Sequence, residues 1–324
     1  MAQKIIIDTD PGTDDAVALM AAVLSPELEL LGVTTVNGNV AVDLCTENAL
    51  RVFDALQIPI PVYEGCAYPL YATSVPNRRP GMPYRGQGAS SIHGNYLDLP
   101  PATTQKQPQH AVDYLIDTLM ASDGDIILVP VGPLTNIGMA ILKEPRIVPK
   151  IQELVIMGGG HEIGNCTPTA EFNIWADPEA ARIVINCGRS IRLVTLDATH
   201  RALVSLADCA RFKSLGTIAA AAAARFTERR VAGYVETRQT QRPDAAPVHD
   251  ALAVCAILDP AVIKTVFVPV DVETRGELTD GMTVCDTHFR SGKEPNVHVA
   301  LDADEPKFVR MLMEILGRKS PADR

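Results

Sequence analysis

The sequence predicts an α/β protein with an open, mostly parallel, Rossmann-like sheet flanked by helices. Short β-branched runs alternate along the chain with Ala- and Leu-rich stretches of helical periodicity. Strand–loop–helix units repeated in this way are typical of parallel sheets. Polar clusters follow directly on several of the runs, as expected for a ligand site at the carboxyl ends of the strands. No linker divides the 324 residues, so we expect a single domain over residues 1–324.

The elements can be assigned in chain order. The first strand carries three consecutive isoleucines, and the helix after it places Ala, Val, Leu and Met on its faces. Turn residues such as Asn37-Gly38-Asn39 and the three glycines at 158–160 end later strands. The predicted strands are Lys4–Asp8, Glu29–Val36, Ile60–Glu64, Ile126–Val131, Glu153–Met157 and Ile191–Leu196. The predicted helices are Asp14–Leu24, Val42–Leu56, Ala111–Ala121, Ile137–Lys143, Pro178–Ile185 and Ala251–Leu258.

Two segments interrupt this alternation. A stretch rich in Pro, Gly and Arg runs from about residue 66 to 101, which is too long for a routine connection. It is therefore either a functional lid or a flexible loop. A helical insertion rich in Ala and Arg covers about residues 207–248.

Composition and charge exclude several functional classes. The formal net charge is −10 and no basic stripe with interleaved aromatics occurs, so we expect neither a nucleic-acid partner nor docking on anionic lipid. No run is apolar and long enough to span a membrane, and the N-terminus lacks the layout of a signal peptide. The seven cysteines are scattered without CxxC spacing, which favours reduced thiols and a cytoplasmic location.

An acidic run follows the first strand: Asp8, Asp10, Asp14 and Asp15 lie within eight residues. Four carboxylates this close repel one another unless a cation lies among them. Ca²⁺ and Mg²⁺ are the natural candidates because both ions take oxygen ligands. A solvated turn that caps the next helix would account for Asp14 and Asp15, but not for Asp8 and Asp10. The run therefore predicts a metal site.

An alternative interpretation is a Mg²⁺-dependent phosphatase. A strand followed by Asp-x-Asp resembles the opening of haloacid-dehalogenase-type phosphatases, in which Asp8 would be phosphorylated. Here Pro11-Gly12-Thr13 follows the second aspartate, and no later Gly-Asp pair with nearby acids completes that pattern. This interpretation is the runner-up.

A second polar segment precedes the predicted helix at Pro178. Asp177 is explained as the cap of that helix. Capping leaves Asn165, Glu171 and Asn173 unexplained, and these side chains suit binding to several hydroxyls of a sugar.

Histidines at two positions are candidates for the same site. His249-Asp250 precedes an apolar helix, where Asp250 is either an ordinary N-cap or a further metal ligand. His249 is either a structural histidine or an acid that protonates a leaving group. His93 lies in the long loop and is ambiguous by itself.

Taken together, these motifs closely resemble the inosine-uridine-preferring nucleoside hydrolase family, with a likeness that runs from about Lys4 to Leu316. The motifs are Asp8–Ala16, Gly38-Asn39, Gly132–Asn136, Met157–Gly159, Gly164-Asn165, Glu171–Asn173, His249–Ala253, Asp280–Val284 and Pro295–Val297. The resemblance implies the nucleoside hydrolase fold and Ca²⁺-dependent hydrolysis of the N-glycosidic bond of ribonucleosides to free base and ribose. It also implies a homodimer or a homotetramer.

The resemblance implies roles for individual residues. Ca²⁺ would be held by Asp10, Asp15, Asp250 and the backbone carbonyl of Thr135. Asp10 would also be the general base, and His249 would assist departure of the base. The residues that would grip the ribose hydroxyls are Asp14, Asn39, Asn165, Glu171 and Asn173, and His93 would line the base pocket.

The chain departs from the family pattern after His93, where Asn95-Tyr96-Leu97-Asp98 occupies the stretch. By the same resemblance, the base pocket would be built from the long loop and the helical insertion, and Tyr84 and Tyr234 are candidates to stack on the base. A third interpretation, a nucleoside- or ribose-binding protein without catalysis, conflicts with the presence of both Asp10 and His249.

Overall fold

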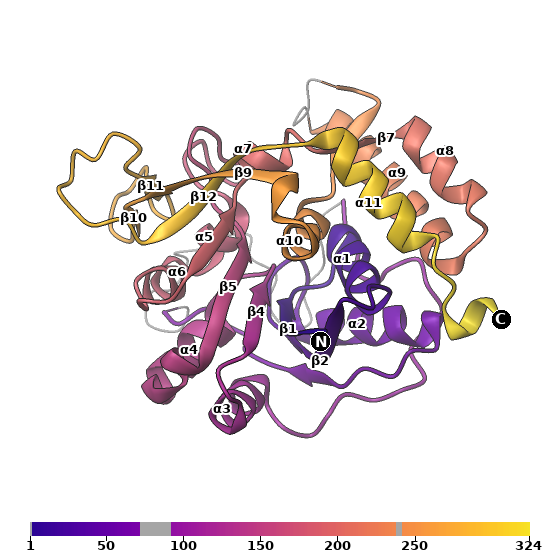
Figure 1. Cartoon of the computed structure of the whole chain (residues 1–324), viewed down its shortest axis with the longest axis horizontal. Helices are drawn as coiled ribbons and strands as arrows, with labels where there is room; N and C mark the ends of the chain where they lie inside the picture. The colour runs from indigo at the N-terminus through magenta and orange to yellow at the C-terminus, as the bar shows by residue number, and fades with distance from the viewer. Residues whose placement is uncertain (1, 72–91, 238–241) are drawn as a thin grey trace.

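An eight-stranded sheet forms the centre of the protein within residues 2–71, 92–237 and 242–324, which the computed structural model describes (Figure 1). Neighbouring strands are parallel throughout, except that β9 runs antiparallel to β12. From one edge to the other the strands are β3 (Val62–Glu64), β2 (Leu28–Thr35), β1 (Gln3–Thr9), β4 (Ile126–Pro130), β5 (Ile151–Met157), β6 (Ile191–Val194), β12 (Val297–Ala303) and β9 (Ile263–Val268). The predicted α/β class with a mostly parallel sheet is confirmed.

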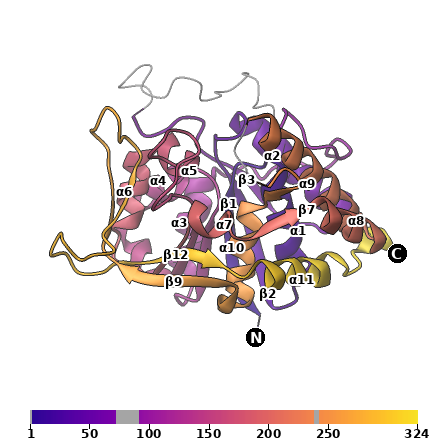
Figure 2. The same ribbon diagram turned by 90° about the horizontal axis from the view of Figure 1, so that it is seen from above.

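Helices cover both faces of this sheet (Figures 1 and 2). One face carries α1 (Thr13–Val23), α2 (Val42–Leu56), α9 (Ile218–Glu236), α10 (His249–Leu258) and α11 (Glu305–Leu316), with α8 (Leu206–Ser214) packed on α9. The other face carries α3 (Ala111–Ala121), α4 (Thr135–Lys143) and α6 (Pro178–Ile185). The first strand shows why both faces are filled: Ile5 and Ile7 pack on the α1 side, Ile6 packs on the α3 side, and all three are buried.

The boundaries largely follow the predicted ones, and α2, α3 and α6 begin and end at the predicted residues. Strand β3 is shorter than expected because Pro59 and Pro61 have no backbone N–H, so its ladder begins only at Val62. Helix α4 starts two residues before Ile137. The segment after Leu258, for which no elements were predicted, supplies β9, β12 and α11.

The two interruptions differ in structure. Of the long loop, residues 66–71 and 92–101 are described, and Tyr84 lies outside the described residues. The insertion forms α8 and α9, followed by β8 (Ala245–Pro247), which pairs antiparallel with β7 (Leu203–Ser205). A second small antiparallel pair, β10 (Val270–Val272) and β11 (Thr283–Cys285), projects from the end of the sheet. Among the helices described, none has the length and apolar character needed to cross a membrane.

Candidate active site

Buried carboxylates gather where β1 ends and α1 begins. Asp10 follows β1, whereas Asp14 and Asp15 lie in the first turn of α1. Asp250 joins them from the first turn of α10, and these four side chains are at most 4% exposed. Oxygens of Asp14, Asp15 and Asp250 all lie within 4.8 Å of one another.

Ionising all the carboxyls of this cluster at once costs free energy, because they are buried and repel one another. Burial, with Asp14 beside it, raises the pKa of Asp15 to about 6. Burial and the neighbouring carboxylates also hold the pKa values of Asp10 and Asp250 well above their usual range. Each carboxyl must therefore hold a proton or share a cation, and a hard divalent cation suits an all-oxygen donor set.

The backbone of three residues lies close to the Asp10 carboxylate. Its Oδ2 accepts the backbone N–H of Asn39 at 2.6 Å, whereas its buried Oδ1 has no hydrogen-bond partner among the described residues. A Cβ at Gly38 would lie 2.0 Å from Oδ2, and one at Gly132 would lie 2.6 Å from Oδ1. Glycine is thus required at both positions for the backbone to come this close. The unpaired Oδ1 is an oxygen donor ready for a cation or a water molecule.

Asn39 and the start of α1 orient the neighbouring carboxylates. Asn39 Nδ2 donates to Asp15 Oδ2 at 3.2 Å and to the carbonyl of Asp10 at 3.2 Å. Asp15 also accepts from the Thr9 hydroxyl at 2.6 Å and from the backbone N–H of Gly12 at 2.9 Å. The predicted ribose residue Asn39 therefore lies directly against two of the predicted metal residues.

His93 reaches the same site from the long loop. The backbone N–H of Thr13 donates to its Nδ1 at 3.2 Å, so the ring proton of neutral His93 is on Nε2. Asp14 Oδ1 lies 4.0 Å from Nδ1. Burial lowers the pKa of His93 to about 4, although Asp14 opposes this shift, so the ring is neutral at pH 7.

Glu171 and Asn173 lie at the ends of β4 and β5. Glu171 caps the short helix α5 (Phe172–Ala176) by accepting the N–H groups of Asn173 and Ile174, and it also accepts from Gly159 at 2.8 Å. Burial raises the pKa of Glu171 to about 7 against these three donors. Asn173 donates to the carbonyls of Val131 and Met157, at 2.8 and 3.2 Å. Both side chains are therefore held rigidly beside the strand ends.

Asn165 has a supporting position in this structure. Its Oδ1 accepts the backbone N–H of Phe172 at 2.9 Å. It thereby holds the segment that carries Glu171 and Asn173.

His249 is buried between two hydroxyl groups. Its Nδ1 lies 2.7 Å from the Thr199 hydroxyl, and its Nε2 lies 2.6 Å from the Tyr234 hydroxyl. Thr199 donates its own proton to the carbonyl of Leu196, so Nδ1–H donates to Thr199 and Tyr234 donates to Nε2. Burial and the nearby Arg230 charge hold the pKa of His249 well below its usual range.

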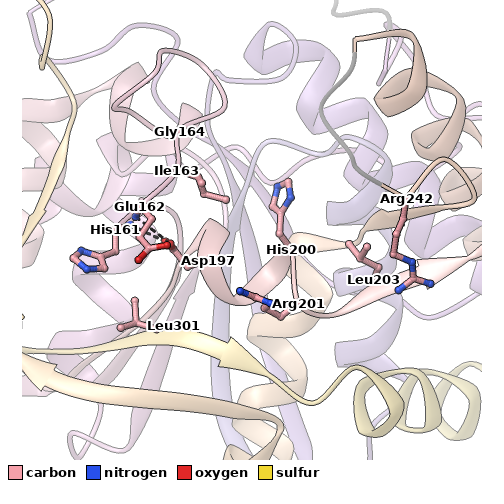
Figure 3. Close-up of a pocket in the computed structure, with 10 residues that line it drawn as sticks. All are labelled: His161, Glu162, Ile163, Gly164, Asp197, His200, Arg201, Leu203, Arg242 and Leu301. Carbon is pink, nitrogen blue, oxygen red and sulfur yellow. Dashed lines mark hydrogen bonds between the residues drawn. The ribbon is translucent and has the colours of Figure 1, made fainter.

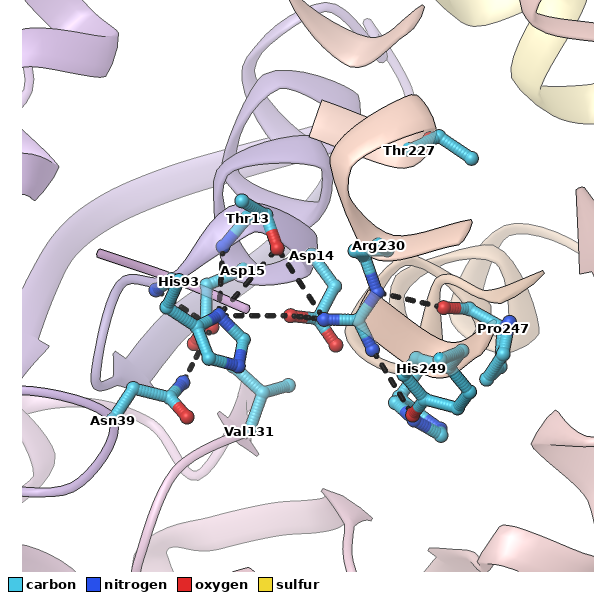
Figure 4. Close-up of polar contacts among 12 residues, drawn as sticks. Thr13, Asp14, Asp15, Asn39, His93, Val131, Thr227, Arg230, Pro247 and His249 are labelled. Carbon is cyan, nitrogen blue, oxygen red and sulfur yellow. Dashed lines mark hydrogen bonds and ion pairs between the residues drawn. The ribbon is translucent and has the colours of Figure 1, made fainter. Parts of the chain in front are cut away.

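Arg230 is the site residue that sequence reasoning missed. Its Nη1 donates to Asp14 Oδ1 at 2.6 Å, and Figure 4 shows the guanidinium between Asp14 and His249. One sequence signal could have identified it. Arg230 precedes the candidate Tyr234 by four residues, which places both side chains on one face of α9.

The side chain of Thr135 is bonded to another carboxylate. Thr135 opens α4, and its hydroxyl donates to Asp177 at 2.7 Å. Asp177 also accepts from Ala180, so its predicted capping role is confirmed. Backbone that approaches Asp10 includes Gly132, two residues after the end of β4.

A cavity of about 700 Å³ adjoins the site where the sheet edge continues over β6 and β12 (Figure 3). Asp197 supports one wall by accepting the backbone N–H groups of His161 and Glu162, at 2.7 and 3.0 Å. His200 also lines the cavity, and its ring centre lies 5.7 Å from that of His249. The His200 ring therefore lies between the cavity and the His249–Tyr234 pair.

Comparison with known proteins agrees with this geometry. The inosine-uridine preferring nucleoside hydrolase family matches residues 5–310. An inosine-uridine preferring nucleoside hydrolase of Leishmania major is 41% identical, with 98% of each chain covered. The pyrimidine-specific ribonucleoside hydrolase RihB of Escherichia coli O157:H7 is 40% identical, with 96% of each chain covered.

Solved structures show the same fold. A plant nucleoside hydrolase superposes with a TM-score of 0.86 at 29% identity, covering 99% of this chain and all of that one. A purine-preferring ribonucleoside hydrolase from Gardnerella vaginalis superposes with a TM-score of 0.84 at 29% identity, covering 97% of this chain and 98% of that one. This chain belongs to the inosine-uridine preferring nucleoside hydrolase family of enzymes.

Proposed function

We propose that this enzyme hydrolyses the N-glycosidic bond of ribonucleosides to free base and ribose, with Ca²⁺ at the carboxylate group. The observation that carries the proposal is the buried cluster of Asp10, Asp14, Asp15 and Asp250 at the carboxyl ends of β1 and β4. Family membership supports the same reaction. A cluster of this kind favours positive charge, which is what the ribose ring develops as the bond breaks.

The donor set fits a hard cation. Asp15 and Asp250, whose carboxylate oxygens lie within 4.8 Å of each other, would hold it together with Asp10. A backbone carbonyl would complete the set. The carbonyl of Val131 is a better candidate than the predicted carbonyl of Thr135, because Val131 precedes Gly132, whose backbone approaches Asp10, and lies beside Asn39 and His93 (Figure 4). When bound, Ca²⁺ orients and acidifies a water molecule.

Asp10 is the proposed general base. Its Oδ2 is held by Asn39, which leaves Oδ1 to accept a proton from a water molecule beside it. The proposed ribose ligands are Asp14, Asn39, Asn165, Glu171 and Asn173. Several of these side chains are immobilised by backbone hydrogen bonds, so the sugar would meet a site that is already organised.

Tyr234 and His249 are the proposed groups for departure of the base. His249 Nε2 accepts the Tyr234 hydroxyl proton and so has none to give, and a proton for the base would come from the Tyr234 hydroxyl once it turns away from Nε2. His249 would act through Tyr234, which refines its predicted role as the acid. His93, on the opposite side of Asp14, would line the base pocket.

A substrate panel tests the proposal. Purified protein is incubated with inosine, adenosine, guanosine, uridine, cytidine and their 2′-deoxy forms, with and without a chelator, and free ribose is measured. Ribose release that stops with the chelator and returns with Ca²⁺ supports the proposal. Phosphate release from a generic ester without ribose release would instead favour the phosphatase interpretation. In that interpretation Asp8 would be the nucleophile, and its Oδ1 accepts hydrogen bonds from Thr34 and Asn136. A cytoplasmic location and a homodimeric or homotetrameric assembly stay predictions of the resemblance.

A further inference from the structure

Arg230 is a buried cation at the centre of an acidic site. It lies in the second half of α9 and is 2% exposed. Removing a guanidinium from water is costly unless it gains a partner, and here the partner is Asp14. Burial alone would lower the pKa of Arg230, but Asp14 and its neighbours raise it above its ordinary value, so the group stays charged.

The contacts of Arg230 join two halves of the site. On one side, Nη1 donates to Asp14 at 2.6 Å and approaches the Thr13 hydroxyl at 3.4 Å. On the other side, Nη2 donates to the Tyr234 hydroxyl at 3.4 Å, and Tyr234 is bonded to His249. The Nε–H donates to the carbonyl of Pro247 at 2.9 Å, which holds the planar group in this orientation.

We propose that Arg230 is a catalytic residue whose guanidinium contacts the departing base and stabilises the negative charge that it develops. This inference rests on the proposed function, because Asp14 marks the ribose side and the Tyr234–His249 pair marks the base side. A guanidinium that bridges these two groups lies where the glycosidic bond would be cut. Arg230 has N–H donors and no acceptor, so it offers the base only positive charge and donated hydrogen bonds.

The step balances without any change in the protonation of Arg230. The glycosidic C–N bond breaks, and its electron pair moves to the base. A water oxygen forms the new bond to the sugar carbon, and Asp10 takes one proton from that water. The base takes one proton, from the Tyr234 hydroxyl or from solvent. The proton held by Asp10 then leaves to solvent, solvent reprotonates Tyr234 if that residue gave the proton, and one water molecule is consumed overall. Arg230 lowers the energy of the charged base before that proton arrives.

A structural role for Arg230 predicts different behaviour. If the guanidinium only neutralises Asp14, its loss should impair sugar binding, and every substrate with the same ribose should lose activity equally. If it stabilises the departing base, the loss should depend on the leaving group. p-Nitrophenyl β-D-ribofuranoside separates the two cases, because nitrophenolate spreads its negative charge and departs with little assistance.

The experiment compares R230M and R230K with wild type on inosine and on p-nitrophenyl riboside. R230M should lower kcat on inosine by about 10²-fold, the usual loss on removing one electrostatic donor, and much less on the nitrophenyl substrate. R230K keeps the charge and should recover part of the loss on inosine. R192M is the matched control, because Arg192 forms a partly buried ion pair with Glu153 away from the carboxylate group. It should leave the ratio of the two rates unchanged.

Equal losses on both substrates in R230M would overturn the inference while leaving the proposed function intact. If R230M does not fold, as judged by its thermal unfolding, R230Q replaces it with the same expectation. No ribose release from inosine by wild type, with Ca²⁺ present, would overturn the proposed function itself and this inference with it.

Discussion

Replacing Glu171 by glutamine should change how the stability of the protein depends on pH. Glu171 is 2% exposed, and its carboxylate accepts three backbone N–H groups, from Gly159, Asn173 and Ile174. Burial nevertheless raises its pKa from 4.5 to about 7. In the unfolded chain the carboxyl ionises near its ordinary value, whereas in the folded protein it keeps its proton to a higher pH.

The direction in which stability changes with pH follows from proton binding. Between pH 4.5 and 7 the folded state holds a proton that the unfolded state has released, so this carboxyl stabilises the fold at low pH and loses that contribution as pH rises through 7. Each pKa unit corresponds to about 1.4 kcal/mol, so the contribution should fall by about 2–3 kcal/mol between pH 5 and 7. E171Q lacks this titration.

Urea unfolding of wild type and E171Q at several pH values between 5 and 7.5 measures the effect. The free energy of unfolding of wild type, minus that of E171Q, should fall by about 2–3 kcal/mol over this range. The exposed Glu162 in the neighbouring loop provides the control, and E162Q should follow the wild-type pH dependence. A difference between wild type and E171Q that stays constant, or grows with pH, would refute the reasoning.

Three further substitutions test other parts of the site. D10N should lower kcat by about 10²–10⁴-fold, because it removes the proposed base, while circular dichroism shows an unchanged fold; wild-type turnover would rule that assignment out. Y234F removes the hydroxyl 2.6 Å from His249 and should slow inosine hydrolysis more than nitrophenyl riboside hydrolysis; identical rate losses would argue for a purely structural tyrosine. D177A leaves three donors without an acceptor, from Leu70, Thr135 and Ala180, and should cost about 3 kcal/mol or more in thermal unfolding; an unchanged Tm would contradict the cap.

Much of the fold could be predicted from local sequence signals. The run of isoleucines in β1 is buried on both faces, and a strand of that kind can only be central in a parallel sheet. The antiparallel edge strand β9 was not predicted, because four consecutive residues of its six are exposed and give no clear alternation. A periodic pattern of apolar residues reflects burial of one face, and this edge strand has few buried residues to produce such a pattern.

The proximity of the candidate carboxylates could be predicted, because each of them follows a strand or opens a helix. Asp14, Asp15 and Asp250 are brought together because the starts of α1 and α10 meet at one edge of the sheet, and Asp10 follows the end of β1 at the same edge. Arg230 could not be assigned, because a charged residue in a helix ordinarily faces solvent and only the packing of α9 on α1 buries this one. The partnership of Tyr234 with His249 likewise depends on tertiary packing.

Calcium binding by the carboxylate group tests the central claim most directly. Isothermal titration of Ca²⁺ into the wild-type protein, D15N and D250N should show binding to the wild type that each substitution weakens. Ribose release from inosine should stop with a chelator and return with Ca²⁺. Wild-type protein that binds no Ca²⁺ and hydrolyses inosine equally well in a chelator would contradict the account.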